Sequence, residues 1–124
     1  MIFIKYILAF LFAFTQTSDC KKLFPGKWKY RNYSTEEAFV VRTLDKQYEY
    51  VENGKYYYEF KIKWLSNCKY ELTYIGTNSP KPSVANVNET CTVEIIGIDS
   101  EYMKYRTIFR DQLDVSEMDK VREK

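Results

Sequence analysis

The stretch that decides the fold is YYYEFKIKWLSNCKYELTY, residues 56–74. It consists of two runs in which apolar and polar residues alternate, separated by Leu65-Ser66-Asn67. Side chains alternate between the two faces of a strand, so each run has one apolar and one polar face. The stretch therefore predicts a β-hairpin at the centre of an antiparallel sheet. Its expected apolar face consists of Tyr56, Tyr58, Phe60, Ile62, Trp64, Cys68, Tyr70, Leu72 and Tyr74.

Further alternating runs flank this hairpin. They predict strands at residues 27–33, 38–44, 47–52, 90–98 and 101–109. In the third predicted strand, Tyr48 and Tyr50 are expected to point inward. Asn53-Gly54 lies between two of the runs and is a strong hairpin signal, because a type I′ turn needs a positive φ at both central residues.

Seven strands joined mostly by short connections indicate a meander, in which each strand pairs with the next. Such a sheet must close or fold over on itself to cover its apolar face and remove its edges. The predicted fold is all-β, an antiparallel meander of about seven strands that forms a small barrel or half-barrel. In the tail, Val115, Met118 and Val121 are spaced by three, which predicts a short C-terminal helix.

The chain of 124 residues has room for one domain. Its first residues, Met1 to Phe14, are apolar or aromatic apart from Lys5. The apolar run of about ten residues is shorter than the roughly 20 that a membrane-spanning helix needs, and is typical of a cleaved export signal. We therefore expect a signal peptide at residues 1–16 and a single β-meander domain at residues 17–124. This predicts a secreted or periplasmic protein with no transmembrane span in the mature chain.

Three cysteines in an exported chain indicate one disulfide and one free thiol. Strands of a meander alternate in direction, so the first and fifth strands start at the same end of the sheet. Cys20 precedes the first strand, Cys68 begins the fifth, and Cys91 begins the sixth at the opposite end. This predicts a Cys20–Cys68 disulfide, with Cys91 as a buried free thiol. The alternatives are a Cys68–Cys91 bridge and lipidation of Cys20 after signal cleavage.

Several function classes are disfavoured by what the chain lacks. It contains no histidine, the commonest general base and a common metal ligand. It has no glycine-rich phosphate loop, and the neighbouring carboxylates Glu36-Glu37 would point apart in a strand or turn. Its 19 basic and 17 acidic residues are interleaved, without a basic stripe for a phosphate backbone. We therefore expect no catalytic residues, metal or cofactor, and no nucleic-acid partner.

Twelve tyrosines, eight phenylalanines and two tryptophans predict an aromatic interior that also carries hydroxyls in need of hydrogen-bond partners. A pocket for a small amphipathic ligand would suit this interior. The alternative is a structural or protein-interaction module with a solid core. The candidate ligand-binding residues are Trp28, Tyr30, Tyr48, Tyr50, Tyr58, Trp64, Tyr70 and Tyr74.

One long irregular segment, residues 77–89, interrupts the strands. Pro80 and Pro82 prevent regular pairing, which places the segment on the surface. Loops of about 12 residues or more are uncommon unless they are functional or disordered. The segment is thus either a binding rim, for a ligand or a protein partner, or a solvated linker. Asn32 and Asn88 begin N-glycosylation triplets, which are relevant only in a eukaryotic source.

Gly26-Lys27-Trp28, at the opening of the first strand, resembles the G-x-W signature of lipocalins. That resemblance implies a barrel with a small ligand inside. The whole chain also looks like a group of small exported bacterial β-meander proteins of unknown function. The likeness rests on Cys20 and on the blocks GKWKY (26–30), VRT (41–43) and IKWLSNCKYELTY (62–74). It supplies no catalytic or binding residues, and Cys91 departs from its pattern.

Overall fold

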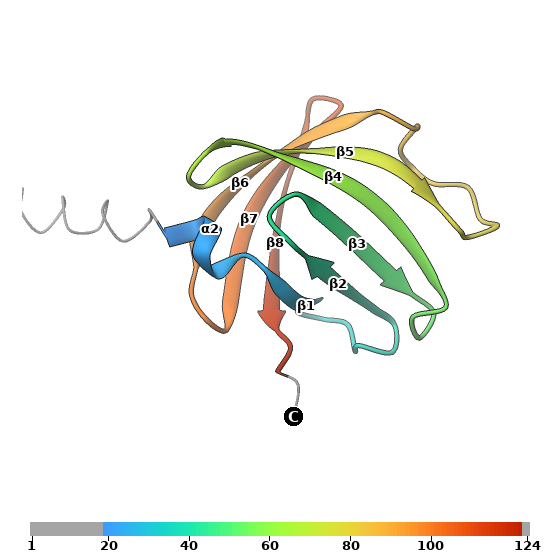
Figure 1. Cartoon of the computed structure of the whole chain (residues 1–124), viewed down its shortest axis with the longest axis horizontal. Coiled ribbons are helices and arrows are strands. Elements are labelled where there is room, and N and C mark those ends of the chain that lie inside the picture. The colour runs from blue at the N-terminus through green and yellow to red at the C-terminus, as the bar shows by residue number, and fades with distance from the viewer. Residues whose placement is uncertain (1–18, 123–124) are drawn as a thin grey trace, which may run out of the picture.

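The computed structural model describes residues 19–122, so the predicted signal peptide at residues 1–16 lies outside the described part. The described part contains one short helix and eight strands (Figure 1). Their bounds are α2 Cys20–Leu23, β1 Gly26–Tyr30, β2 Ala38–Arg42, β3 Lys46–Val51, β4 Tyr56–Ser66, β5 Lys69–Thr77, β6 Thr90–Ile98, β7 Tyr102–Phe109 and β8 Gln112–Lys120. Each strand pairs antiparallel with the next, and β8 pairs with β1 to close a barrel. The predicted all-β meander is confirmed.

The eighth strand occupies the segment that was expected to be a helix. Instead of a helical face, β8 presents Met118 inward, fully buried opposite Met103 of β7 and Tyr30 of β1. Pairing on both sides gives β8 backbone hydrogen bonds to two neighbours and removes the open edges of β1 and β7. The predicted C-terminal helix is wrong because barrel closure outweighs the weak three-residue spacing of Val115, Met118 and Val121.

The central hairpin predicted from residues 56–74 is formed by β4 and β5. Ile62 faces Leu72 and Trp64 faces Tyr70 across this pair. The Asn53-Gly54 hairpin that precedes β4 is also present, with φ of 58° at Asn53 and 81° at Gly54. The two hairpins fix the register of β3, β4 and β5.

Tyr48 and Tyr50 point away from the barrel interior, so their predicted inward orientation is wrong. The pairing of β3 with β4 places Gln47 and Glu49 opposite inward residues of β4. Directly paired residues share a face, so the alternating tyrosines must lie outside. Gln47 is only 2% exposed. On the outer face, Tyr50 stacks on Phe39 of β2 with ring centroids 4.9 Å apart.

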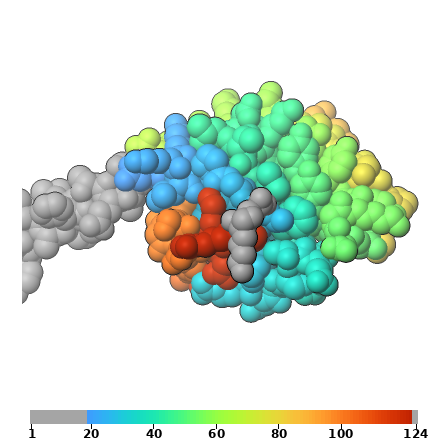
Figure 2. All heavy atoms as spheres, turned by 60° about the horizontal axis from the view of Figure 1, so that its bottom comes forward, coloured from blue at the N-terminus to red at the C-terminus, as the bar shows by residue number. Residues whose placement is uncertain are grey.

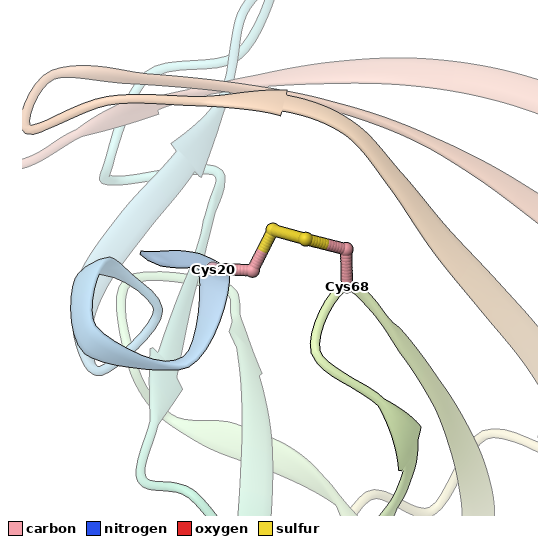
Figure 3. Close-up of a disulfide and its surroundings, with 2 residues drawn as sticks. All are labelled: Cys20 and Cys68. Atoms are coloured by element: carbon pink, nitrogen blue, oxygen red, sulfur yellow. A yellow bond between two sulfur atoms is a disulfide. The ribbon is translucent and has the colours of Figure 1, made fainter. Parts of the chain in front are cut away.

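A disulfide joins Cys20 of α2 to Cys68 in the turn between β4 and β5 (Figure 3). The two Cα atoms are 5.3 Å apart, and Cys91 is a free thiol. The predicted pairing is confirmed. Both alternatives, a Cys68–Cys91 bridge and lipidation of Cys20, are wrong because the bridge occupies the sulfur atoms that they require.

Aromatic side chains close this end of the barrel around Phe24, the residue that follows α2. Phe24 is fully buried, and its ring lies edge-on to those of Trp64 and Tyr70, with centroids 5.0 Å apart in each case. The indole N–H of Trp28 donates to the Phe24 carbonyl at 2.9 Å. In Figure 2 this N-terminal segment, in blue, lies against the C-terminal strand, in red. We call Phe24, Trp28, Trp64 and Tyr70 the aromatic plug.

Candidate functional site

A pocket of about 610 Å³ lies at the end of the barrel opposite the aromatic plug. Apolar and aromatic side chains from three strands form part of its wall: Phe60, Leu72, Tyr74, Tyr105 and Phe109. Polar residues also line it: Tyr30, Glu89, Thr90, Thr107, Gln112, Asp114 and Ser116. Small-molecule sites are typically concavities of about 300–1,000 Å³ with mostly apolar walls and a few polar groups. The pocket has this character.

The register of the central hairpin builds the aromatic wall. Tyr74 faces Phe60 across β4 and β5, and their ring centroids are 5.5 Å apart. One step further into the barrel, Leu72 faces Cys91 at the start of β6. The inward face that the alternating sequence predicts therefore becomes the wall of the pocket.

The loop between β5 and β6, residues 78–89, borders the pocket and is drawn in yellow to orange in Figure 1. Arg110, in the β7–β8 turn, holds this loop. Its Nε and Nη2 each donate to the Glu89 carboxylate at 2.7 Å, and Nη2 also donates to the Val84 carbonyl at 3.2 Å. The Arg110 hydrogen bonds and the Asn86 N–H lower the pKa of Glu89 to about 2. The segment proposed as a rim does border the pocket, and an ion pair latches it.

A chain of polar side chains runs through the interior beside the pocket. Arg42 donates from Nε to Gln47 Oε1 at 2.9 Å, and Gln47 donates from Nε2 to Glu49 Oε2 at 3.2 Å. The Tyr30 hydroxyl donates to the other Glu49 oxygen at 3.1 Å. Because Tyr30 also lines the pocket, the chain connects a buried cation to the pocket wall.

Arg42 itself is a buried cation surrounded by aromatic faces. The residue is 3% exposed, and its guanidinium carbon lies 4.7 Å from the Phe24 ring centroid and 6.0 Å from those of Trp28 and Tyr105. The negative faces of these rings and the Gln47 oxygen offset part of the cost of removing the charge from water. Arg42 thus belongs to the barrel interior above the aromatic plug.

Burial raises the pKa of Glu49, against the opposing effects of the Tyr30 hydrogen bond, the Arg42 charge and the Gln47 hydrogen bond. Burial and then the Glu49 charge raise the pKa of Tyr30 well above its ordinary value. Tyr30 therefore keeps its proton and directs it at Glu49. Another hollow, of about 320 Å³, shares Tyr30 and Ser116 with the pocket and is also lined by Glu49 and Tyr50.

Cys91 places a thiol in the pocket wall. Burial, followed by the charges of Glu49 and Glu71, raises the pKa of this thiol to about 11. The thiolate is the reactive form of cysteine, so Cys91 is chemically quiet at neutral pH. It offers a position at which occupancy of the pocket can be monitored.

The eight predicted ligand-binding residues lie in four different places. Two line the pocket: Tyr30 and Tyr74. Three form part of the aromatic plug: Trp28, Trp64 and Tyr70. Tyr58 packs beside Tyr74, with ring centroids 6.5 Å apart. Tyr48 and Tyr50 lie on the outer face. The side chains predicted to surround one ligand are therefore divided between the pocket, the plug and the surface.

Sequence reasoning missed most of the polar lining of the pocket. Gln112, Asp114 and Ser116 belong to β8, in the tail where the only element expected was a short helix around Val115, Met118 and Val121. Phe24, the centre of the plug, lies before the first predicted strand and is not among the predicted site residues. An apolar residue just before a Pro-Gly pair is too common a pattern to indicate such a role.

Comparison of the chain with protein-family models, curated proteins and solved structures found no match. Within residues 19–122, no three His, Cys, Asp or Glu side chains are grouped so that they could hold a metal ion. No helix in that range is both long and apolar enough to cross a membrane. What the site offers chemically is an apolar wall, a set of hydrogen-bonding groups and a loop held by an ion pair.

Proposed function

We propose that this protein is a non-enzymatic binding protein that holds one small amphipathic molecule in the pocket at the end of the barrel. The observation that carries the proposal is the pocket of about 610 Å³, which combines an aromatic wall with polar groups. The apolar part of such a molecule gains free energy when it leaves water for the wall. Its polar end can meet the hydroxyls and carboxylates.

The alternative is a protein-interaction module with a solid core. The aromatic plug supports that alternative at one end of the barrel, where Phe24 and Trp28 are fully buried. The other end favours a ligand, because its inward side chains leave a pocket. The Cys20–Cys68 disulfide supports a secreted or periplasmic location, since disulfides persist in oxidising compartments. The closed barrel is also compatible with the lipocalin-like character that Gly26-Lys27-Trp28 suggests.

Titration with N-phenyl-1-naphthylamine, an uncharged fluorescent probe, tests the proposal. We expect saturable fluorescence enhancement with one probe per chain, and displacement of the probe by decanol. Occupancy should also slow alkylation of Cys91, which lines the pocket. Native mass spectrometry of the purified protein would detect a retained molecule directly.

A pair of neighbouring substitutions locates the binding. Thr107 lines the pocket, whereas Ile108 is the next residue of β7 and is 46% exposed. Thr107→Trp should fill part of the pocket and weaken probe binding at least tenfold, while Ile108→Trp should leave binding unchanged. Circular dichroism and denaturant unfolding establish that both variants are folded. Absence of probe binding to the wild type, or equal binding by both variants, would overturn the proposal.

A further inference from the structure

We infer that the pocket selects a cationic amphiphile, an organic ammonium with an apolar tail, over an anionic one such as a fatty acid. The inference rests on the proposed function, because it specifies the chemical class of ligand for the same pocket. Four features of the pocket carry it: its uncompensated carboxylate, its hydrogen-bond acceptors, its aromatic faces, and the position of the nearby cations.

The charged residues that line the pocket are acidic. Among the described residues, the lining includes Glu89 and Asp114 but no lysine or arginine. Arg110 neutralises Glu89 through two hydrogen bonds. Within residues 19–122 no ion pair involves Asp114, so its charge is uncompensated. A carboxylate ligand would be repelled by this residue, and an ammonium would be attracted.

The hydroxyl nearest to Glu49 presents an acceptor to the pocket. Tyr30 donates its only hydroxyl proton to Glu49 Oε1 at 3.1 Å, so its oxygen retains only lone pairs for a ligand. An alkylammonium carries N–H donors and no acceptor. A carboxylate carries acceptors only, and would find no donor in the Tyr30 hydroxyl while that hydroxyl donates its proton to Glu49.

The aromatic wall favours the same sign of charge. Rings of Phe60, Tyr74, Tyr105 and Phe109 line the pocket, and because the Arg110 guanidinium carbon already lies 4.6 Å from the Phe109 ring centroid, the first three are the rings offered to a ligand. The π face of an aromatic ring attracts a cation within about 6 Å of its centroid. An organic ammonium can therefore contact the rings with its charged end as well as with its tail, whereas a carboxylate meets the negative side of the ring quadrupole.

The buried cation Arg42 does not reverse this preference. Arg42 is not part of the pocket lining, and its guanidinium carbon lies 6.0 Å from the centroid of the Tyr105 ring. Two of its donors are occupied, Nε by Gln47 and Nη1 by the Met103 sulfur at 3.3 Å. Arg42 is connected to the pocket wall only through Gln47, Glu49 and Tyr30, so the pocket itself presents the Tyr30 hydroxyl and not the guanidinium.

Three amphiphiles with the same tail test the inference: decylammonium, decanol and decanoate, each displacing N-phenyl-1-naphthylamine at pH 7 and below its micellar concentration. Because Asp114 is exposed, we expect decylammonium to bind about two- to fivefold more tightly than decanol, the effect of one exposed ion pair, and decanoate to bind more weakly than decanol. Raising the salt from about 10 mM to about 500 mM should reduce the amine preference while leaving decanol unaffected.

Two charge-neutralising variants identify the source of the preference. Asp114→Asn should lower the preference for decylammonium over decanol, leaving only the part that the aromatic rings and the Tyr30 acceptor supply. Glu36→Gln makes the same change of charge in the β1–β2 connection, outside the pocket lining, and should leave the ratio intact. Equal or tighter binding of decanoate than of decanol, or an unchanged ratio in Asp114→Asn, would overturn the inference alone. Failure of decanol itself to bind would instead overturn the proposed function, and the inference with it.

Discussion

Cys91 reports on the electrostatics of the pocket wall, because burial and two acidic neighbours act on its thiol. Its pKa is about 11 in the folded protein, compared with an ordinary value of 9.0. The folded protein therefore holds the thiol proton more tightly than the unfolded chain does. The resulting stabilisation is complete below the unfolded pKa near 9, and is lost as the pH rises through about 11.

Alkylation of Cys91 by iodoacetamide should accordingly accelerate about tenfold per pH unit from pH 7 to pH 10, because the thiolate fraction grows in that proportion below the pKa. An ordinary thiol levels off near pH 9. Intact-mass time courses measure the rate, and the chain unfolded in guanidinium chloride with its disulfide intact serves as the control. If the alkylation rate of the folded protein stopped rising below pH 9, the pocket wall would not be raising the pKa of the thiol.

The orientation of Glu49 could have been predicted from the sequence, although its hydrogen bonds could not. If Glu52 faces Lys55 across Asn53-Gly54, counting back along both strands places Glu49 opposite Tyr58, as observed. Judging β3 by hydrophobicity alone instead assigns its tyrosines to the interior. The contact between Glu49 and Tyr30 was beyond prediction, because it joins β3 to β1 across the barrel and depends on side-chain rotamers.

At the scale of elements, the loop of residues 78–89 depends on one ion pair for its attachment to the β7–β8 turn. Arg110→Gln should accelerate amide hydrogen exchange in this loop by roughly two- to fivefold, the effect expected of one exposed pair. Hydrogen-exchange mass spectrometry provides the measurement. The matched control is Arg122→Gln, which breaks the exposed Arg122–Glu101 pair at another site. If the amides of residues 78–89 exchanged at equal rates in Arg110→Gln and Arg122→Gln, Arg110 would not be what holds the loop.

The stabilisation that the Arg110–Glu89 ion pair supplies should depend on pH. The pKa of Glu89 is lowered from 4.5 to about 2, so the folded protein binds the proton less tightly than the unfolded chain. The contribution of the latch is present above about pH 4.5 and is lost as the pH falls through about 2. Carboxyl NMR shifts should therefore show Glu89 titrating near pH 2, and near its ordinary value in Arg110→Gln. If Glu89 titrated at the same pH in the wild type and in Arg110→Gln, the Arg110–Glu89 ion pair would not be what lowers its pKa.

The element that could not be predicted is β8. Its apolar residues are few, and two of them, Val115 and Met118, are spaced with the following Val121 as in a helix, so local sequence gave no reason to expect a strand. The strand forms because β1 and β7 each need a partner, and that need appears only once the other seven strands are arranged in space. Asp114, on which the inferred charge selectivity depends, lies in β8, so its place in the pocket lining was not predictable either.

At the scale of the whole molecule, strand direction was predictable because alternation and turn signals determine a meander. That direction was sufficient to choose the Cys20–Cys68 bridge over its alternatives. The pocket was not predictable in the same way. Its volume depends on how side chains from β4, β5, β7 and β8 fill the barrel together, and on the conformation of the loop at residues 78–89.

The Cys20–Cys68 disulfide should stabilise the whole domain through the unfolded state. The cysteines are 48 residues apart, for which loop-closure entropy gives a stabilisation of roughly 4 kcal/mol, with about 2–4 kcal/mol typical in practice. The double variant Cys20→Ala, Cys68→Ala should lose about this much unfolding free energy in urea and show a larger m-value, since its unfolded chain is less compact. A loss below about 1 kcal/mol would mean that the unfolded chain is scarcely restricted by the bridge.

The position of the bridge makes a second outcome of that double variant informative. The disulfide lies at the plugged end of the barrel, while the pocket lies at the other end, lined by β4 to β8. Under conditions where the variant is fully folded, binding of N-phenyl-1-naphthylamine should therefore stay within about twofold of the wild type, because a cross-link that acts on the unfolded state leaves the folded pocket unchanged. Cys91→Ala, which alters the pocket wall and spares the bridge, should give the reverse pattern: near-normal stability and altered binding. If loss of the bridge weakened binding as strongly as it lowered stability, the plug and the pocket would have to be one cooperative structure rather than two separable ends.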